Sequence, residues 1–337
     1  MKQKKFSLGK LMAMQEFTVF LLVLIVFVLL SVTRTSVFLS SSNLLSTLMG
    51  MATQGILAIG VSTALMGGCF DMSVGSTMGM SAMVCALFCT SGINPWISAL
   101  LALIIAAAFG TVNGLMVGYI GLNPFIATLG TMSVGRGIVS VLTLGMPVSI
   151  LNVENINSFR FIGAGSVGGV PMLAIILVVF VAAAEFVHRK SSAVMKVRYV
   201  GSNFNAAYLS GINVKKTKLF LYITTGLSAG MAGILSLARF GSATNTLGTG
   251  IEMDIICGAV IGGISMAGGI GSVIGAVLGV LLMNLISNAL VLFRVSAYWQ
   301  ELITGVITVL AVLMDLMIHS RPVKNAKAPK EAAVAKK

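Results

Sequence analysis

Long, continuously apolar stretches alternate with short polar or glycine-rich segments along almost the whole chain. A bilayer core about 30 Å thick needs roughly 20 apolar residues for each helical span. The pattern predicts ten membrane-spanning helices, at residues 17–33, 44–66, 74–91, 96–120, 124–145, 170–187, 218–238, 251–267, 272–293 and 297–318. A β-barrel is disfavoured because the runs do not alternate between apolar and polar residues. The predicted fold is an all-α, polytopic membrane protein.

Two boundaries between predicted helices, at residues 67–73 and 268–271, are rich in glycine. Irregular backbone at membrane depth is tolerated only where it is buried in protein or lines a water-filled cavity. We therefore expect interrupted or re-entrant helices at these two positions.

Small residues recur every four positions within several predicted spans. This spacing lets helix backbones approach closely, which is how helices associate in lipid. The repeats are Gly110, Gly114 and Gly118; Gly226 and Gly230; Ala229 and Gly233; and Gly271, Gly275 and Gly279. They predict a closely packed bundle.

Composition supports lipid as the natural environment. Of the 337 residues, 57% are hydrophobic and 9% are charged, and the mean hydropathy is +1.02. A soluble domain carries about 25% charged residues. The net charge of +13 comes mostly from three basic blocks, at residues 2–10, 189–218 and 321–337. The positive-inside rule places such blocks in the cytoplasm, so they indicate orientation and not nucleic-acid binding.

This orientation divides the chain into three parts. Residues 1–16 are predicted to be a basic cytoplasmic N-terminus, 17–318 a transmembrane domain, and 319–337 a basic, disordered cytoplasmic tail. Within the domain, residues 146–169 are expected to face outward, and the loop at about 188–217 is expected to face the cytoplasm.

Motifs for catalysis or metal binding are not apparent in the sequence. The P-loop pattern G-x-x-x-x-G-K-[ST] is absent. Residues 226–230 match the G-x-S-x-G pattern of serine hydrolases, but they lie inside a predicted span and not at a strand-to-helix turn. The four cysteines have no neighbours that would complete a tetrahedral metal site; they are Cys69, Cys85, Cys89 and Cys257. The sequence therefore predicts no enzyme, no metal and no cofactor in this chain.

Asp71 and Ser73 lie in the first glycine-rich boundary. A carboxylate at membrane depth is expensive and suggests function. One interpretation is that either residue caps the following helix. The other is that Asp71 belongs to a gate or a solute pathway, and both interpretations remain open.

A second acidic segment begins a later span. Thr249-Gly250-Ile251-Glu252 fits a capping box, in which Thr249 would cap the helix and Glu252 would bind back to it. Asp254 lies two residues deeper and is harder to explain as a cap. We therefore keep Asp254 as a candidate pathway residue.

Three asparagines fall inside predicted spans. Asn284 and Asn288 are four residues apart, on the opposite side of their helix from Gly275 and Gly279. They are expected either to hydrogen-bond to a neighbouring helix or to line a polar pathway. Asn113 is open to the same two interpretations.

The cytoplasmic loop carries the clearest local signal. Asn203 is a favourable N-cap and Gly211 a favourable residue just beyond a helix end, so a two-turn helix is predicted at 204–210. Phe204 and Tyr208 would share one face with the Ala at position 207 between them. Such a helix suits either the groove of a partner protein or the membrane surface.

This stretch resembles the coupling loop of ribose-type ABC transporter permeases, where an Ala-Ala pair and a following Ser-Gly dock into the ATPase subunit. The matching residues are Ala206, Ala207, Ser210 and Gly211, with Asn203, Phe204 and Tyr208 beside them. Four more segments follow the motifs of that family in order, at 70–76, 123–131, 252–271 and 298–300. The resemblance therefore covers about 250 residues.

The resemblance implies the membrane-spanning permease subunit of an importer in the bacterial inner membrane, acting on a sugar or a sugar-like solute. It implies a homodimer or pseudodimer of permeases, a cytoplasmic ATPase subunit that binds the ATP, and an external solute-binding protein, either periplasmic or a lipoprotein. An ion-coupled secondary transporter is the main alternative. A related ABC permease for nucleosides or branched-chain amino acids is another, since the sequence does not name the solute.

Overall fold

Helices make up nearly all of the regular structure in the computed structural model, which describes residues 15–319. Within these residues, eight helices are long and apolar enough to cross a membrane: α2 (Gln15–Thr33), α4 (Ser41–Met66), α6 (Pro95–Leu115), α7 (Pro124–Thr143), α9 (Met172–Lys190), α12 (Val214–Phe240), α14 (Val273–Leu292) and α15 (Ala297–His319). The all-α, polytopic fold is thus confirmed. The predicted basic N-terminus and disordered tail lie almost entirely outside the described residues.

Two shorter helices occupy the other two predicted spans. They are α5 (Val74–Thr90), with 17 residues, and α13 (Ile251–Ile261), with 11 residues. At 1.5 Å per residue, α13 rises about 16 Å, roughly half of a bilayer core. The prediction that this helix continues to residue 267 is wrong, because Gly262 and Gly263 follow it and Gly263 has a left-handed φ of 92°.

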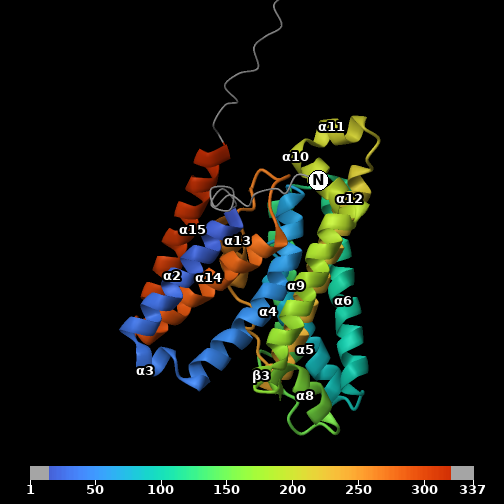
Figure 1. Cartoon of the computed structure of the whole chain (residues 1–337). Coiled ribbons are helices and arrows are strands. Elements are labelled where there is room, and N and C mark those ends of the chain that lie inside the picture. The colour runs from blue at the N-terminus through green and yellow to red at the C-terminus, as the bar shows by residue number, and fades with distance from the viewer. Residues whose placement is uncertain (1–14, 320–337) are drawn as a thin grey trace, which may run out of the picture.

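Short elements gather at the two ends of the bundle (Figure 1). At one end lie α10 (Ser192–Ser202), α11 (Phe204–Leu209) and the C-terminal end of α15. The opposite end carries α3 (Thr35–Phe38), α8 (Ile156–Ala164), the antiparallel pair β1 (Val148–Ser149) with β4 (Ser242–Ala243), and the hairpin of β2 (Ser166–Val167) and β3 (Val170–Pro171). The two long predicted loops therefore both contain helix.

Asparagine–proline pairs begin two of the long helices. The Asn94 side chain accepts a hydrogen bond of 2.9 Å from the backbone N–H of Trp96 at the start of α6, and Asn123 does the same for Phe125 at 3.0 Å in α7. Each pair supplies a side-chain cap followed by a proline whose missing N–H would be unpaired anyway. Helix α6 runs into a π-helical turn, η1 (Met116–Ile120).

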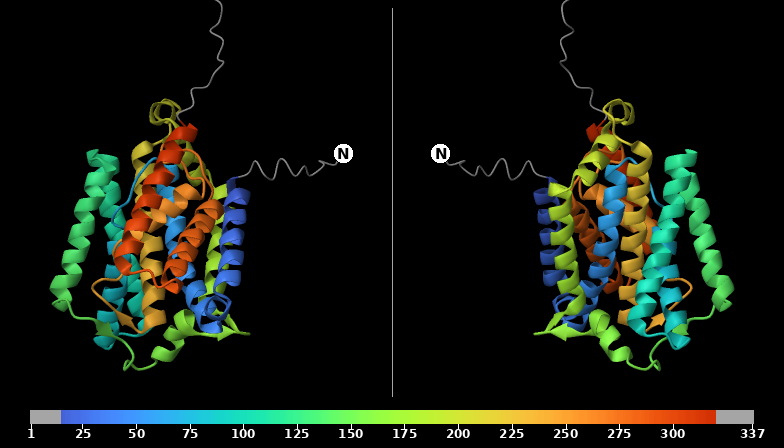
Figure 2. Two further views of the ribbon diagram at one scale, coloured as in Figure 1. Left: turned by 90° about the vertical axis from the view of Figure 1, so that its left-hand side faces the viewer. Right: turned by 90° about the vertical axis from the view of Figure 1, so that its right-hand side faces the viewer.

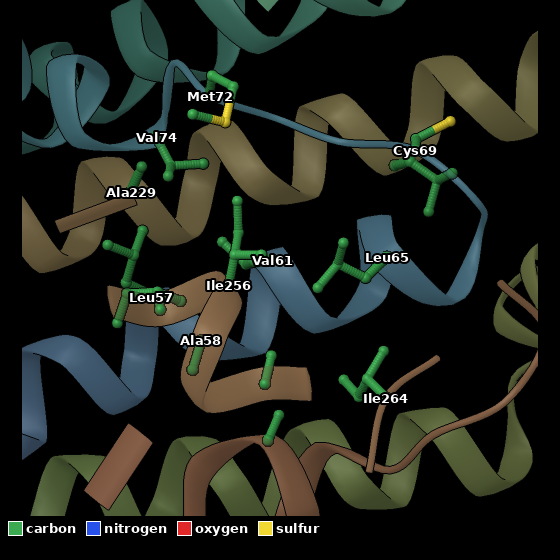
Figure 3. Close-up of a cluster of buried hydrophobic side chains, with 14 of the residues drawn as sticks. Leu57, Ala58, Val61, Leu65, Cys69, Met72, Val74, Ala229, Ile256 and Ile264 are labelled. Atoms are coloured by element: carbon green, nitrogen blue, oxygen red, sulfur yellow. The ribbon is translucent and has the colours of Figure 1, made fainter. Parts of the chain in front are cut away.

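The core is built around α12, which packs against α4, α5 and α6. A cluster of buried side chains joins α4, α5 and α12 to α13, and it includes Leu57 and Val61 of α4, Ala229 of α12 and Ile256 of α13 (Figure 3). Helix α7 stands at the outer edge of the molecule (Figure 2). The polar groups described below therefore lie within an apolar interior.

Close helix contacts occur where the small-residue repeats predict them. A Cβ built on Gly226 would lie 2.6 Å from the carbonyl oxygen of Ala106 and 3.1 Å from the Cα of Gly110. Gly279 approaches the carbonyl of Gly258 so closely that a Cβ could not be accommodated. Gly271 does not belong to this helical repeat, because α14 begins after Ser272.

The two glycine-rich boundaries are confirmed as interruptions between helices, and they touch each other. The backbone N–H of Gly269 donates a hydrogen bond of 2.7 Å to the carbonyl of Met66, the last residue of α4. The second interruption is longer than expected, since it spans residues 262–272. The second interruption thus satisfies the last carbonyl group of α4 inside the protein.

Candidate functional site

The segment between α4 and α5 holds a buried carboxylate. Asp71 is 4% exposed. Its Oδ1 accepts hydrogen bonds from the backbone N–H of Ser73 at 2.9 Å and from the Ser73 hydroxyl at 2.6 Å, and its Oδ2 accepts one of 2.9 Å from the hydroxyl of Thr225. Three donors thus compensate for the removal of this carboxylate from water.

The geometry modifies the capping interpretation of Asp71 and Ser73. Ser73 is the N-cap residue of α5, but its side chain makes no capping bond there. Its hydroxyl is donated to Asp71, and it accepts a bond of 2.8 Å from the amide of Asn113 on α6. Asp71 holds the turn before the helix and also reaches Thr225 on α12, so it links segments and does not simply cap α5.

Two more contacts fix the same segment to its surroundings. Tyr222 of α12 donates its hydroxyl to the carbonyl of Phe70 at 2.9 Å, and the hydroxyl of Thr128 on α7 accepts from the N–H of Met72 at 3.1 Å. We define the Asp71 network as Asp71, Ser73, Asn113, Thr128, Tyr222 and Thr225.

A role for Thr128, Tyr222 and Thr225 was not predicted from the sequence. Each lies in an apolar span, and only the three-residue spacing of Tyr222 and Thr225, which places both on one face of α12, could have indicated a shared role.

One atom in the Asp71 network has no partner. The Oδ1 atom of Asn113 is buried and accepts no hydrogen bond, while the amide nitrogen is bonded to Ser73. A buried carbonyl oxygen without a donor costs free energy of about 1–3 kcal/mol. The network is therefore not fully satisfied in this arrangement.

The capping box predicted at Thr249–Glu252 is wrong. The N-cap of α13 is Gly250, with a left-handed φ of 77° and no side-chain capping bond. Glu252 is buried instead, and its Oε2 lies against Gly75 of α5. The local pattern failed because α13 begins one residue later than the pattern predicts, with Gly250 and not Thr249 at the N-cap, and the buried Glu252 carboxylate lies between this helix end and α5.

A cation that the sequence analysis passed over lies near this carboxylate. Arg136 of α7 donates from Nη1 to the carbonyl of Leu247 at 2.6 Å, and more weakly to that of Asn245 at 3.5 Å. Its positive charge acts on Glu252 across the interior. Arg136 therefore ties the segment between β4 and α13 to α7, and its position inside an apolar span was the signal available in the sequence.

Asp254 lies half-buried on α13, and within the described part of the chain no hydrogen bond joins it to the Asp71 network. Asn284 and Asn288 are also separate from that network. Asn284 donates to Gln54 of α4, and Asn288 donates to Asn43 of α4 at 2.9 Å. These are interhelical hydrogen bonds to α4. Gly275 and Gly279 lie on another face of α14, against α13.

The predicted cytoplasmic helix is present as α11. Asn203 accepts a hydrogen bond of 3.0 Å from the N–H of Ala206, Ser210 forms the C-cap, and Gly211 has a left-handed φ of 78°. Both of its predicted end residues are therefore confirmed.

The faces of α11 differ from the prediction. Ala207 is buried against Val200 and Val214, whereas Phe204 and Tyr208 are 51% and 68% exposed. The Ala207 side chain points inward, toward α10 and the start of α12, and does not belong to the face that α11 exposes. Ala206 remains exposed.

A groove of about 810 Å³ lies beside α11. One wall is η1 with Gly121, and the other runs from Phe204 through α11 to the start of α12. Lys218 stands 5.6 Å from the ring centre of Phe204, and Lys215 stands 5.8 Å from that of Tyr119. The groove thus combines exposed apolar surface with positive charge.

Comparison with known proteins gives consistent matches. The family model described as "Branched-chain amino acid transport system / permease component" matches residues 43–312. The ribose import permease protein of Escherichia coli K12 is 36% identical over 299 residues, covering 88% of this chain and 92% of the relative. That of Bacillus subtilis 168 is 34% identical over 90% of this chain and 93% of the relative.

A D-allose transport system permease protein of E. coli K12 is 32% identical over 83% of this chain and 85% of the relative. No solved structure matches the chain significantly. The matched region includes the Asp71 network, α11 and most of the bundle. The chain therefore belongs to the branched-chain amino acid transport system / permease component family and is a multi-pass protein of the inner membrane.

Proposed function

We propose that this chain is the membrane-spanning permease subunit of an ABC importer for a sugar or a sugar-like solute. The observation that carries the proposal is the similarity to ribose and D-allose permeases over more than four-fifths of the chain. The family description names branched-chain amino acids, but these individual relatives are named for sugars. A sugar is therefore favoured over an amino acid or a nucleoside.

The proposed partners follow from this assignment. A separate cytoplasmic ATPase subunit would bind and hydrolyse ATP, so this chain needs no cofactor and performs no covalent chemistry. An external solute-binding protein would deliver the sugar. Two permease subunits would assemble as a homodimer or a pseudodimer. Conformational change driven by the ATPase would then open the pathway alternately to the outside and to the cytoplasm.

The surface around α11 supports docking of the ATPase. Phe204, Tyr208 and Leu209 expose 51%, 68% and 85% of their surface, and such exposed apolar residues outside a membrane span mark an interaction site. Lys215 and Lys218 border the groove. The partner surface we propose is apolar at its centre and acidic at its edge, matching both features.

For the pathway we propose a gate role for Asp71, Ser73 and Asn113. Support comes from the burial of the carboxylate at an interruption between helices and from the unpaired oxygen of Asn113. Asp254 is proposed to border the pathway, since it is ionisable and half-buried at membrane depth.

Asn284 and Asn288 are proposed to stabilise the contact between α4 and α14, because both pair with α4. A role in the pathway is thereby no longer favoured for these two residues.

The test is uptake by proteoliposomes that contain the permease, its ATPase and its binding protein. Radiolabelled pentoses, hexoses and branched-chain amino acids are supplied in turn, with ATP inside the vesicles or with an ion gradient and no ATP. Sugar uptake that requires ATP and the binding protein supports the proposal. Uptake driven by the gradient alone would identify a secondary transporter, and uptake of amino acids only would identify the other class of permease.

A further inference from the structure

Four glycines from three distant segments meet where α10 contacts the two interruptions. We define the glycine junction as Gly68, Gly201, Gly268 and Gly269. A Cβ built on Gly268 would lie 2.8 Å from the carbonyl oxygen of Gly201 and 2.9 Å from the backbone nitrogen of Gly68. At these distances only glycine allows the three backbones to touch.

Gly201 is the member contributed by α10. A Cβ on Gly201 would collide with the carbonyl oxygen of Met66 and would lie 2.8 Å from the nitrogen of Gly269. Those two atoms are the acceptor and the donor of the 2.7 Å hydrogen bond that joins the interruptions. Gly201 therefore packs directly on the bond that connects the end of α4, immediately before residues 67–73, to residues 262–272.

Side-chain contacts attach the same region to α9 and α10. Arg198 of α10 donates to the carbonyl of Gly271 at 3.3 Å. His188 at the end of α9 lies 3.1 Å from the hydroxyl of Thr63 near the end of α4, measured from its Nε2 atom. Helix α10 is thus fastened to the second interruption, and α9 is fastened to α4 close to the first.

Helix α11 is fastened to α10 in turn. Only Asn203 separates the two helices, and Val200 of α10 packs with Ala207 of α11 and Val214 of α12. A displacement of α11 therefore carries α10 and Gly201 with it. Beyond the junction, one interruption carries Asp71, and the other joins α13, which carries Glu252 and Asp254, to α14.

We infer that the glycine junction passes movement of α11 to both interruptions together, with Gly201 as the positioning residue. The inference rests on the proposed function, because it assumes that an ATPase moves α11. A close backbone contact suits this task, since packed interfaces shift as units and do not deform continuously. An added methyl group at Gly201 separates the three segments without touching α11 or the Asp71 network.

The first test compares Gly201→Ala with two control variants in the complete transporter. Gly130→Ala adds a methyl where no atom lies within 4 Å of the new Cβ, and Gly226→Ala crowds a helix contact elsewhere in the bundle. The measured quantities are co-purification with the ATPase, the rate of ATP hydrolysis, and the sugar taken up per ATP hydrolysed.

We expect Gly201→Ala to keep the ATPase bound and hydrolysing while sugar uptake per ATP falls roughly tenfold, within the range that substitutions along a coupling route produce. Both controls should keep the uptake per ATP of the wild type. A Gly201→Ala variant that assembles and takes up as much sugar per ATP as the wild type overturns the inference. An equal loss of uptake per ATP in Gly226→Ala also overturns it, because the effect would then come from crowded helix packing in general. Wild-type protein without ATP-driven sugar uptake would refute the proposed function itself.

A second measurement needs no substitution in the junction. Spin labels are placed at Tyr199 of α10 and Ile270 of the second interruption, which are 54% and 51% exposed. A reference label is placed at Ile97, at the start of α6, which lies at the end of the bundle away from α10. When the complete transporter is trapped with ATP bound, the distance between the labels at 199 and 270 should stay constant, while the distance between those at 199 and 97 should change. A change in the first distance, or no change in either, overturns the inference.

Discussion

At the residue scale, the buried carboxylate of Asp71 combines a local partner with one that is distant in the sequence. Its three donors come from Ser73, two residues away, and from Thr225, 154 residues away. The glycine-rich sequence around Asp71 indicated the interruption, because glycine acts locally on the backbone. It could not indicate Thr225, because that pairing exists only once α12 packs against the segment.

Replacing Asp71 by Asn is expected to destabilise the protein by about 1–3 kcal/mol, since the charged acceptor of three hydrogen bonds becomes a neutral amide with one acceptor oxygen. Thermal unfolding in detergent measures the change. In a double-mutant cycle with Thr225→Val, the second substitution should cost less when Asp71 is already Asn. Strictly additive effects would show that the Thr225 bond contributes nothing.

Gly211 offers a cleaner test, because a Cβ there meets no atom within 4 Å and only the left-handed φ of 78° restricts the side chain. Asn tolerates this conformation, whereas a β-branched residue does not. Gly211→Val should therefore weaken co-purification with the ATPase, and Gly211→Asn should retain it. Equal binding by both variants would contradict a role for the end of α11.

At the scale of the elements, the sequence predicted what depends on neighbours along the chain. The ends of α11 follow from Asn203 and Gly211, and both are where the pattern placed them. The capping box at Glu252 had the same kind of local signal but failed, because α13 begins after Gly250 and the Glu252 carboxylate is buried against α5. Tertiary packing, which no local pattern encodes, decided between these outcomes.

Arg136 is expected to hold the segment between β4 and α13 in place. Arg136→Leu removes the donor to Leu247 and the charge that acts on Glu252, leaving a buried carboxylate uncompensated. Hydrogen exchange at residues 244–250 should become faster in this variant, while exchange in α4 remains unchanged. Unaltered exchange at 244–250 would mean that Arg136 does not restrain the segment.

At the scale of the whole molecule, the apolar exterior and the placement of the short elements indicate how the chain is oriented in the membrane. Large hydrophobic side chains are exposed along α2, α7 and α15, as expected for surfaces that face lipid or another apolar partner. Helices α8 and α10 lie at opposite ends of the bundle (Figure 1). The basic residues of 189–218 gather at the α10 end, which the positive-inside rule assigns to the cytoplasm.

Orientation can be tested with single introduced cysteines, because the four native cysteines are buried and should react little with a membrane-impermeant thiol reagent. Ser158 of α8 and Ser192 of α10 are both exposed, so a difference in labelling between them reports the side of the membrane and not burial. In whole cells, Ser158→Cys should be labelled and Ser192→Cys should not, and disruption of the membrane should make both reactive. Labelling at position 192 alone in intact cells would show that the predicted orientation is reversed. Helix α11 and its groove would then lie outside the cell, where no cytoplasmic ATPase could reach them.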